Sequence, residues 1–599
     1  MLRQPTLGAL LAPAALLLSA PLAAHAASTE LDPITVTATG QPTAASQTLA
    51  AQTLITRRDI DRAQAQTLAD LLRFYAGMEI GRNGGAGSTT SVFTRGGNST
   101  HTLVLVDGVR VNPNTSGGAA LQNITPSMIE QIEIIKGPRA ALYGADAISG
   151  VINVITRQAD RDGLSGEVNA RGGSDKTWEG SARGTWREGN SQASLQVERL
   201  KTDGYQAFAG LDARAGYDRN SINARASTQI GSASIGAQLW DSRGTAEYYD
   251  TFTPALQSQD YRNQTLAVDL GLPLSAAWQL QTRASRTEDR IDQNQSADFA
   301  KSVRSTLAAD AVFSHGIQRL TLGARFANED VDALSFGSAF DEDRDILTLR
   351  AQDEVNWNRH HLVAGGSWAD YDGFGSRWDG SLDYGFDVTP GARLIASVGT
   401  GFRAPDASSR FGFGGNPDLN PEKARNLELG WQQSLGSAQR VDIRVFQSDV
   451  RDLINVVCDA SFNCLAENVD RSRNRGLEAS YTLRSDAWSA LLSGIIQNPQ
   501  DRNARSQLLR RAKRSATLRI NRDFGVWDAG VDVLTSAERP DFGTTLGGYT
   551  LVNATVAWRI APKTELRLRG ENLLDKRYET AAPYLQPRAQ VYASIRQQF

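Results

Sequence analysis

The sequence is short of cysteine, of histidine and of long apolar runs. Its 599 residues include two cysteines and five histidines, too few cysteines for a disulfide-built scaffold. Hydrophobic residues make up 40%, which argues against a bundle of membrane-spanning helices. The 63 basic and 66 acidic residues leave a formal charge of −3, so no large field attracts nucleic acid. The HExxH, GxSxG and GxxxxGK[ST] patterns are absent, and we expect no enzymatic activity.

Residues 1–26 are predicted to be a secretory signal. Arg3 supplies the positive start, an apolar stretch follows, and residues 24–26 (AHA) have the small-x-small form of a cleavage site. Two prolines interrupt the stretch, which argues against an uncleaved anchor helix. Export places the chain where disulfides persist. We therefore expect Cys458 and Cys464 to form a local disulfide, because no further ligand lies nearby for zinc.

The character of the sequence changes near residue 158. Residues 45–157 predict a compact mixed α/β domain, with a helix that begins at Thr67 and apolar strands at 103–106 and 151–155. Asp107-Gly108 predicts a tight turn after the first of these strands. Residues 43–53 lack large aromatics, and we expect them to form a flexible link.

From residue 158 onward, apolar and polar residues alternate with period two. Val556, Trp558 and Ile560 point one way, and the residues between them point the other. Such segments, separated by Gly, Asn and Asp, predict antiparallel strands. The alternation fits both a soluble sandwich and a membrane barrel. The 442 residues (599 − 157), at about 20 per strand with its connection, predict roughly 22 strands, the size of a barrel with a plugged lumen.

Short motifs follow one another along the chain in a fixed order. They are DPITVTA at 32–38, TRGG at 94–97, VLVDGVRVN at 104–112, IEIIKGPR at 132–139, ALYGADAISGVIN at 141–153, GFRAP at 401–405, NPDLNPE at 416–422, RGLE at 475–478, NLLDKRY at 572–578 and the terminal Phe599. In this order they resemble the TonB-dependent outer-membrane receptors. The resemblance implies an all-β transmembrane barrel at 158–599, a plug domain at 45–157 inside its lumen, a coupling tail at 27–44, and a place in the Gram-negative outer membrane.

The resemblance also implies a protein partner. Residues Asp32, Pro33, Ile34, Thr35, Val36, Thr37 and Ala38 are similar to the family's coupling box, which binds the inner-membrane TonB energy transducer. An extended segment with alternating apolar residues suits strand addition, although an ordinary edge strand has the same pattern. We expect a monomer whose outer face contacts membrane lipid, with no nucleic-acid partner.

Within the family, the short length and the loops at 83–87, 116–119 and 508–513 are most similar to the cobalamin-transporting branch. This implies energy-coupled uptake of cobalamin or a related corrinoid. The implied ligand contacts are Thr89, Ser91, Asn98, Thr115, Ser116, Thr251 and Arg510. The alternatives are that these are ordinary polar loop residues, or that the same mechanism imports a ferric siderophore or a glycan.

An acidic group matches positions where the family binds calcium. Its members are Asp218, Asn220, Tyr249, Asp250 and Asp260, and oxygen ligands of this kind suit calcium. Gln206 and Gly216 stand where the family supplies further ligands, so solvated loop acids remain an alternative. The run Asp341, Asp343 and Asp345 has EF-hand-like spacing, but Ile346 replaces the required glycine, and we expect a solvated loop. We expect His101 to be a polar loop residue of the plug, and we expect no catalytic cofactor.

Overall fold

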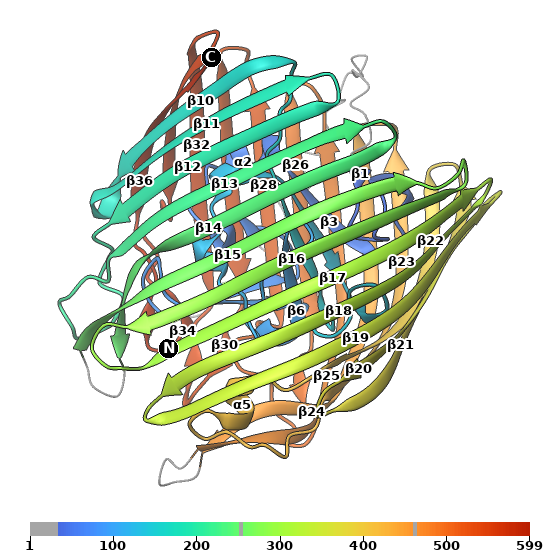
Figure 1. Ribbon diagram of the computed structural model, residues 1–599. Helices are drawn as coiled ribbons and strands as arrows, with labels where there is room; N and C mark the ends of the chain where they lie inside the picture. Colours follow the sequence, from blue (N-terminus) through green and yellow to red (C-terminus); the bar gives the residue numbers. More distant parts are fainter. Residues whose placement is uncertain (1–33, 251–254, 459–463) are drawn as a thin grey trace.

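The structure of the chain, a computed structural model, describes residues 34–250, 255–458 and 464–599 (Figure 1). The predicted signal, the first part of the coupling tail with Asp32 and Pro33, and Thr251 lie outside the described residues.

Among the described residues, no helix is both long enough and apolar enough to cross a membrane.

Most of the chain forms one closed antiparallel barrel. Its strands are β10 (Gly163–Gly173), β11 (Thr177–Glu188), β12 (Ser191–Thr202), β13 (Tyr217–Ile230), β14 (Ala233–Asp250), β15 (Ala255–Pro273), β16 (Trp278–Gln293), β17 (Phe299–His315), β18 (Gln318–Ser335), β19 (Ser338–Trp357), β20 (His360–Tyr371), β21 (Gly375–Thr389), β22 (Ala392–Arg403), β23 (Glu422–Leu435), β24 (Gln439–Cys458), β25 (Cys464–Arg484), β26 (Trp488–Gln497), β27 (Gln500–Asp501), β28 (Arg514–Asp523), β29 (Trp527–Ser536), β32 (Tyr549–Ala561), β33 (Thr564–Glu571) and β36 (Gln590–Gln598). The short β27 continues β26 along β25, so the barrel has 22 strands. The predicted number is confirmed.

The two ends of the barrel differ in the length of their connections. At one end, named here the turn end, neighbouring strands are joined by a few residues, as between β11 and β12. At the other, the loop end, the longer connections carry α5 (Ala407–Phe411), β30 (Arg539–Asp541), β31 (Thr544–Leu546), β34 (Glu579–Ala581) and β35 (Tyr584–Leu585). In Figure 1 the C-terminus marks the turn end at the top, and α5 marks the loop end at the bottom.

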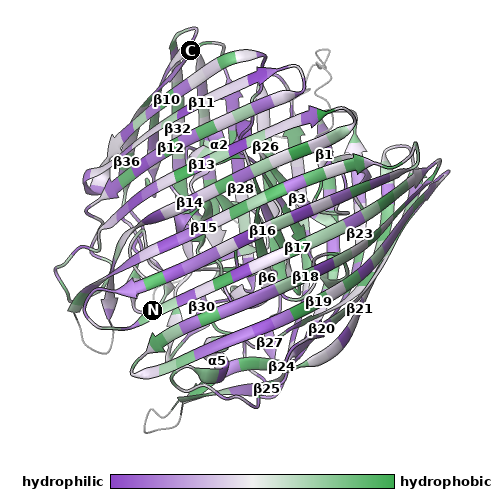
Figure 2. Cartoon of the chain, viewed as in Figure 1, coloured by the Kyte–Doolittle hydropathy of each residue, from purple (hydrophilic) through white to green (hydrophobic). Residues whose placement is uncertain are grey.

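The barrel wall is apolar outside and polar inside. Leu195, Leu266 and Leu429 are 53%, 49% and 62% exposed on the outer face, while Arg219 and Arg444 are buried inside. Figure 2 shows the resulting alternation of apolar and polar residues along the strands. A soluble sandwich buries its apolar face, whereas a membrane barrel turns that face to lipid. The expected transmembrane barrel is therefore confirmed over the sandwich.

The lumen holds a small mixed domain built on a five-stranded sheet of order β3-β8-β9-β6-β7. Its elements are β3 (Ala51–Thr56), α2 (Arg57–Ala63), α3 (Leu68–Leu72), β4 (Met78–Arg82), β5 (Thr90–Thr94), η2 (Ser99–His101), β6 (Thr102–Val106), β7 (Val109–Arg110), η3 (Leu121–Asn123), η4 (Pro126–Met128), β8 (Ile129–Lys136), α4 (Ala140–Tyr143) and β9 (Gly150–Thr156). The predicted apolar strands are β6 and β9, which pair in parallel and are almost wholly buried, as unbroken apolar runs require. The helix predicted at Thr67 begins there but ends at Leu72.

Two local predictions are wrong. Residues 43–53 are not a free link, because they contain β2 (Thr43–Ala44), η1 (Ala45–Gln47) and the start of β3. Leu49 and Ala50 are buried, so this segment is fixed by apolar packing. Residues 341–345 are not a loop, since they lie within β19 and pair with β18.

Candidate functional site

The plug presents its apical segments to the longer barrel loops at the loop end. Of the predicted ligand contacts, Thr89 and Ser116 are exposed, Ser91 and Asn98 are half-buried, and Thr115 is buried. The carbonyl of Thr115 accepts the backbone N–H of Ser408 at 3.0 Å. The structure thus brings several of these residues to one face of the plug. Thr251 lies outside the described residues.

Arg510 joins a barrel loop to a plug apex. Its Nε donates to the two carboxylate oxygens of Asp541 at 2.9 and 3.0 Å, and its Nη1 donates to Asn83 Oδ1 at 3.1 Å. The backbone of Arg510 has a φ of +61°, a left-handed conformation that costs energy for a residue with a side chain. Because Asp541 neutralises its charge, Arg510 supplies position more than net charge.

The neighbouring Arg511 is buried and has no carboxylate in direct contact among the described residues. Its guanidinium lies 4.2 Å from the centre of the Phe93 ring, and Nη2 donates to Asn98 Oδ1. Within the part of the chain that the structure describes, Arg511 forms no ion pair and its Nε has no partner. Burial lowers the pKa of Arg511, and nearby Glu79 acts in the opposite direction. An unpaired buried cation is costly, so an anionic group bound here would be stabilised.

Sequence reasoning singled out Arg510 and missed Arg511. The signal was present as two consecutive arginines in the segment 508–513. What the sequence does not show is that Asp541, which is 31 positions from Arg510, neutralises only one of them. Glu79, the acid nearest to Arg511, is already bound by Arg539.

The coupling segment, residues 34–44, is folded against the plug at the turn end. β1 (Ile34–Thr35) pairs with β2, and the carboxylate of buried Glu133 accepts hydrogen bonds from Thr35 Oγ1 at 2.9 Å, Val36 N at 3.0 Å and Thr37 N at 2.6 Å. From the barrel, Gln352 Nε2 donates to the carbonyl of Thr39 at 2.8 Å. The main-chain donors of this segment are therefore occupied inside the lumen.

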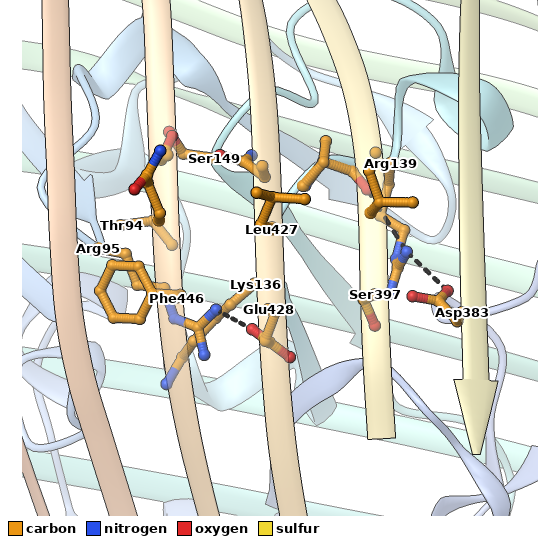
Figure 3. A pocket seen from close by; sticks show the side chains of 17 residues that line it. Thr94, Arg95, Lys136, Arg139, Ser149, Asp383, Ser397, Leu427, Glu428 and Phe446 are labelled. Carbon is orange, nitrogen blue, oxygen red and sulfur yellow. Dashed lines mark hydrogen bonds and ion pairs between the residues drawn. The ribbon is translucent and has the colours of Figure 1, made fainter.

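A cluster of charged side chains connects the plug to the wall, and Figure 3 shows three of its members, Arg95, Lys136 and Glu428. This plug–wall charge cluster consists of Arg95, Lys136, Glu428, Arg444 and Glu478. Arg95 Nε lies 2.9 Å from Glu478, and its Nη1 pairs with Glu428, which Arg444 contacts at 3.0 Å. Lys136 also pairs with Glu478 and donates to the carbonyl of Ala76 at 2.6 Å. Buried ions in such a network compensate one another's desolvation.

The seam beside this cluster is closed. A cavity of about 40 Å³ lies between plug and wall, lined by Arg95, Lys136, Arg139 and Asp383 among others. It has room for a few water molecules and none for a large ligand. A second cavity of about 660 Å³ opens on the turn-end side and is also lined by Lys136. Passage of a large ligand through this seam thus requires the plug to move.

Comparison with known proteins identifies both parts of the chain. The family described as "TonB-dependent Receptor Plug Domain" matches residues 44–151, and the family described as "TonB dependent receptor-like, beta-barrel" matches residues 145–573. The chain belongs to the TonB-dependent receptors.

Solved receptors share this fold at low sequence identity. A mutant of the ferric enterobactin receptor of Pseudomonas aeruginosa, in complex with enterobactin, matches with a TM-score of 0.78 at 17% identity, covering 92% of this chain and 99% of that one. The siderophore receptor PirA of Acinetobacter baumannii gives 0.77 at 17%, with coverage of 92% and 98%. The siderophore receptor PiuA of Acinetobacter baumannii gives 0.77 at 16%, with coverage of 96% and 99%. These likenesses show the fold.

Membership of this family shows which end of the barrel faces the outside of the cell. The receptor lies in the Gram-negative outer membrane and acts in TonB-dependent uptake, in a family of transporters and not of enzymes. Outer-membrane barrels have short periplasmic turns and longer extracellular loops. The loop end, with Arg511 and the plug apices, therefore faces outward, and the coupling segment faces the periplasm.

The residues predicted to bind calcium do not converge as they stand. Asp218 is held by Arg199 at 3.1 Å, and Asp260 accepts the hydroxyl of Thr245 at 2.6 Å. Tyr249 is buried and donates to the carbonyl of Ala213. Asn220 donates to Asp218 at 3.3 Å, and Asp250 accepts from Gln257 at 3.3 Å. Among the described residues, no three His, Cys, Asp or Glu side chains gather as a metal site. Calcium binding stays a prediction, and no step below depends on it.

Two further residues have definite places. Cys464 is disulfide-bonded and lies opposite Cys458 in the register of β24 and β25; the chain has no other cysteine. His101 is only 1% exposed, and its Nε2 lies 3.1 Å from Glu422 of the barrel. The expectation of a polar loop histidine is therefore wrong, because plug and wall bury this side chain between them.

Proposed function

We propose that the receptor imports a bulky, anionic metal chelate, and we place a ferric siderophore first. The observation that carries this proposal is Arg511, a buried cation without a direct ion pair among the described residues, in contact with Asn98 of the plug. Iron(III) held by three doubly deprotonated catecholate groups carries net negative charge, which Arg511 would neutralise. Solved receptors that are similar in fold are named for ferric enterobactin or for siderophores, which supports the same ligand class.

Aromatic side chains at the outer rim support a ligand with flat rings. Arg410 stacks on Phe374 and Phe411, at 4.8 and 4.4 Å from the ring centres. Phe336 and Phe413 lie 5.7 Å apart and are 74% and 65% exposed. Exposed aromatic surface of this kind marks a binding region, and an arginine between rings suits an anionic aromatic group.

A corrinoid is the second candidate. It is favoured by the segment 508–513, which resembles the cobalamin-transporting branch and which contacts the plug apices through Asn83 and Asn98. Cobalamin carries a phosphate, so Arg511 would serve either ligand. Uptake follows one sequence in both cases: capture at the loop end, release of the coupling segment from Glu133, pairing with TonB, and opening of the plug–wall seam.

Binding and uptake assays distinguish the two ligands. We expect purified receptor to bind a ferric catecholate chelate at micromolar concentration, and cells that express it to accumulate radiolabelled iron from that chelate. Uptake of radiolabelled cobalamin without uptake of the iron chelate would reverse the order of the candidates.

The role of Arg511 is tested by Arg511→Gln, with Lys513→Gln as the matched control. Both changes remove one positive charge from the same loop, but Lys513 is exposed. We expect the first variant to bind the anionic ligand about tenfold more weakly, as loss of one charge-assisted contact implies. Equal affinity in the two variants would remove the basis of the proposal.

A further inference from the structure

A group of basic side chains covers the outer face of β23, β24 and β25 near the loop end. This basic patch consists of Lys423, Arg425, Arg451, Arg471, Arg473, Arg475 and Arg502. On each strand the residues between them, such as Ala424, Val450 and Ser472, are buried on the inner face. Because side chains alternate across a strand, the basic groups point away from the lumen.

The strand register places three of these charges side by side. Lys423 is the direct partner of Arg451, and Arg451 is the direct partner of Arg471. Neighbouring strands are about 4.8 Å apart, and like charges directly opposite each other are destabilising. The backbone N–H of Arg502 donates to the carbonyl of Arg471 at 2.7 Å, which brings a fourth basic residue to the end of the row.

Little negative charge balances the patch. Lys423 lies 3.5 Å from Asp452, and Arg473 pairs with Asp449. Among the side chains that the structure describes, Arg451 and Arg471 form no ion pair with a carboxylate, and Arg425 lies directly opposite Asp449. The repulsion along the row is therefore relieved only in part, by Asp452 at Lys423.

The patch lies at the border of the lipid-facing belt on the side of the loop end. Going toward the turn end, the first apolar outward residues are Leu427 on β23, Leu477 on β25 and, beyond Asp449 and Gln447, Val445 on β24. They are 43%, 42% and 55% exposed. Arg425 and Leu427 are two positions apart on β23, a distance of about 7 Å. Charges at this height stand beside lipid headgroups and not beside acyl chains.

On another face of the wall, a row of basic residues is balanced by acidic neighbours. Arg243, Arg262 and Arg290 also form a row across β14, β15 and β16. There, Asp241 lies 2.9 Å from Arg262, and Asp292 lies 2.8 Å from Arg290.

On β18 and β19 the outward residues are acidic instead. Asp330 lies opposite Asp343, and Asp332 lies opposite Asp341. The outer face of β18 and β19 therefore differs in the sign of its charge from that of β23, β24 and β25.

We propose that the basic patch binds the phosphate-bearing headgroup of an outer-leaflet lipid. The arginine fork matches two phosphate oxygens at once, and clustered basic residues at a membrane surface attract anionic lipid. A bound phosphate would relieve the repulsion along the row from Lys423 to Arg471. The site lies on the outer wall, apart from the lumen, so it is independent of the ligand that the receptor imports.

Native mass spectrometry of the intact receptor in detergent tests the proposal. The probes are bisphosphorylated lipid A and the same lipid without its phosphates. We expect the phosphorylated form to bind, and Arg451→Gln/Arg471→Gln to weaken its binding about tenfold, as loss of two interfacial charges implies. Equal binding of the two lipids, or equal binding by wild type and variant, would overturn the proposal.

Matched variants separate the site from general charge. Arg243→Gln/Arg262→Gln removes the same charge at the same height from a row that aspartates neutralise, and should change lipid binding less than about twofold. Arg451→Lys/Arg471→Lys keeps the charge but loses the fork, so its binding should lie between that of wild type and that of the glutamine variant. A further test adds inorganic phosphate to the receptor with bound lipid A. If millimolar phosphate displaces the lipid completely, the patch binds a soluble anion, and the proposal is contradicted.

Discussion

The carboxylate of Glu133 accepts the backbone N–H of Thr37 at 2.6 Å inside the barrel. The same carboxylate accepts the N–H of Val36 and the hydroxyl of Thr35. Strand addition to a partner uses these same main-chain donors. We therefore expect docking on Glu133 and the proposed pairing with TonB to exclude each other, so that the partner binds only after the segment leaves the plug.

Replacing Glu133 by glutamine should loosen the coupling segment. The amide keeps the shape but loses the charge-assisted hydrogen bonds, which favours the undocked state by about 1.5–3 kcal/mol. The measurement is the rate at which a cysteine introduced by Val36→Cys reacts with a thiol label. We expect a faster rate in Glu133→Gln and no change in Glu130→Gln, since Glu130 is exposed on the same strand. An unchanged rate in both would show that Glu133 does not hold the segment.

The plug–wall charge cluster should behave as a unit. Arg95→Gln leaves two buried carboxylates, Glu428 and Glu478, with one cation fewer. Loss of one partner from a buried ion pair costs about 3–5 kcal/mol, and we expect the plug to unfold at correspondingly lower urea concentration. The exposed pair of Lys176 and Asp203 supplies the control, because Lys176→Gln should cost at most about 1 kcal/mol.

A double-mutant cycle shows whether the effect belongs to the pair. Adding Glu428→Gln to Arg95→Gln removes the charge that the first change leaves unpaired. The loss of folding stability in the double variant should then be smaller than the sum of the two single losses by about 0.5–3 kcal/mol. Strict additivity would mean that Arg95 acts through packing on Phe446, whose ring centre lies 4.6 Å from its guanidinium.

A charge introduced on the lipid-facing belt should reduce folding stability by an amount that depends on its depth in the bilayer. Leu429 lies mid-way along β23, and Leu435 is its last residue at the turn end. Leu429→Arg should reduce folding stability in vesicles by about 2–4 kcal/mol, and Leu435→Arg by about 0–1 kcal/mol. The measurement is urea-induced unfolding of the reconstituted barrel. Equal costs at the two positions would contradict the placement of the belt.

The sequence predicts the barrel well, because every strand carries its own signal. Val556, Trp558 and Ile560 alternate with inward residues whatever their neighbours are, and all three are exposed on β32 as expected. The strand count follows from length for the same reason. The plug sheet was predictable too, since β6 and β9 are unbroken apolar runs.

The misses depend on contacts between distant segments. His101 reads as a polar loop residue until Glu422, 321 positions away, is placed against it. Glu133 reads as one acid in a strand motif until the coupling segment folds back onto it. The segment 341–345 reads as a loop because the acids of β19 face outward, opposite acids of β18. In each case the contacting residue lies far away in the sequence, so the pattern of neighbouring residues does not reveal it.

Closure of the barrel has a consequence for how the molecule is assembled. The first and last strands, β10 and β36, pair with each other. The barrel therefore cannot close until its last strand is in place. The plug precedes the barrel in the chain and contacts its wall at widely separated strands, from Glu198 at Ser127 to Asp528 at Arg62. A chain that stops before β36 would leave two unpaired strand edges, on β10 and β33, open to aggregation.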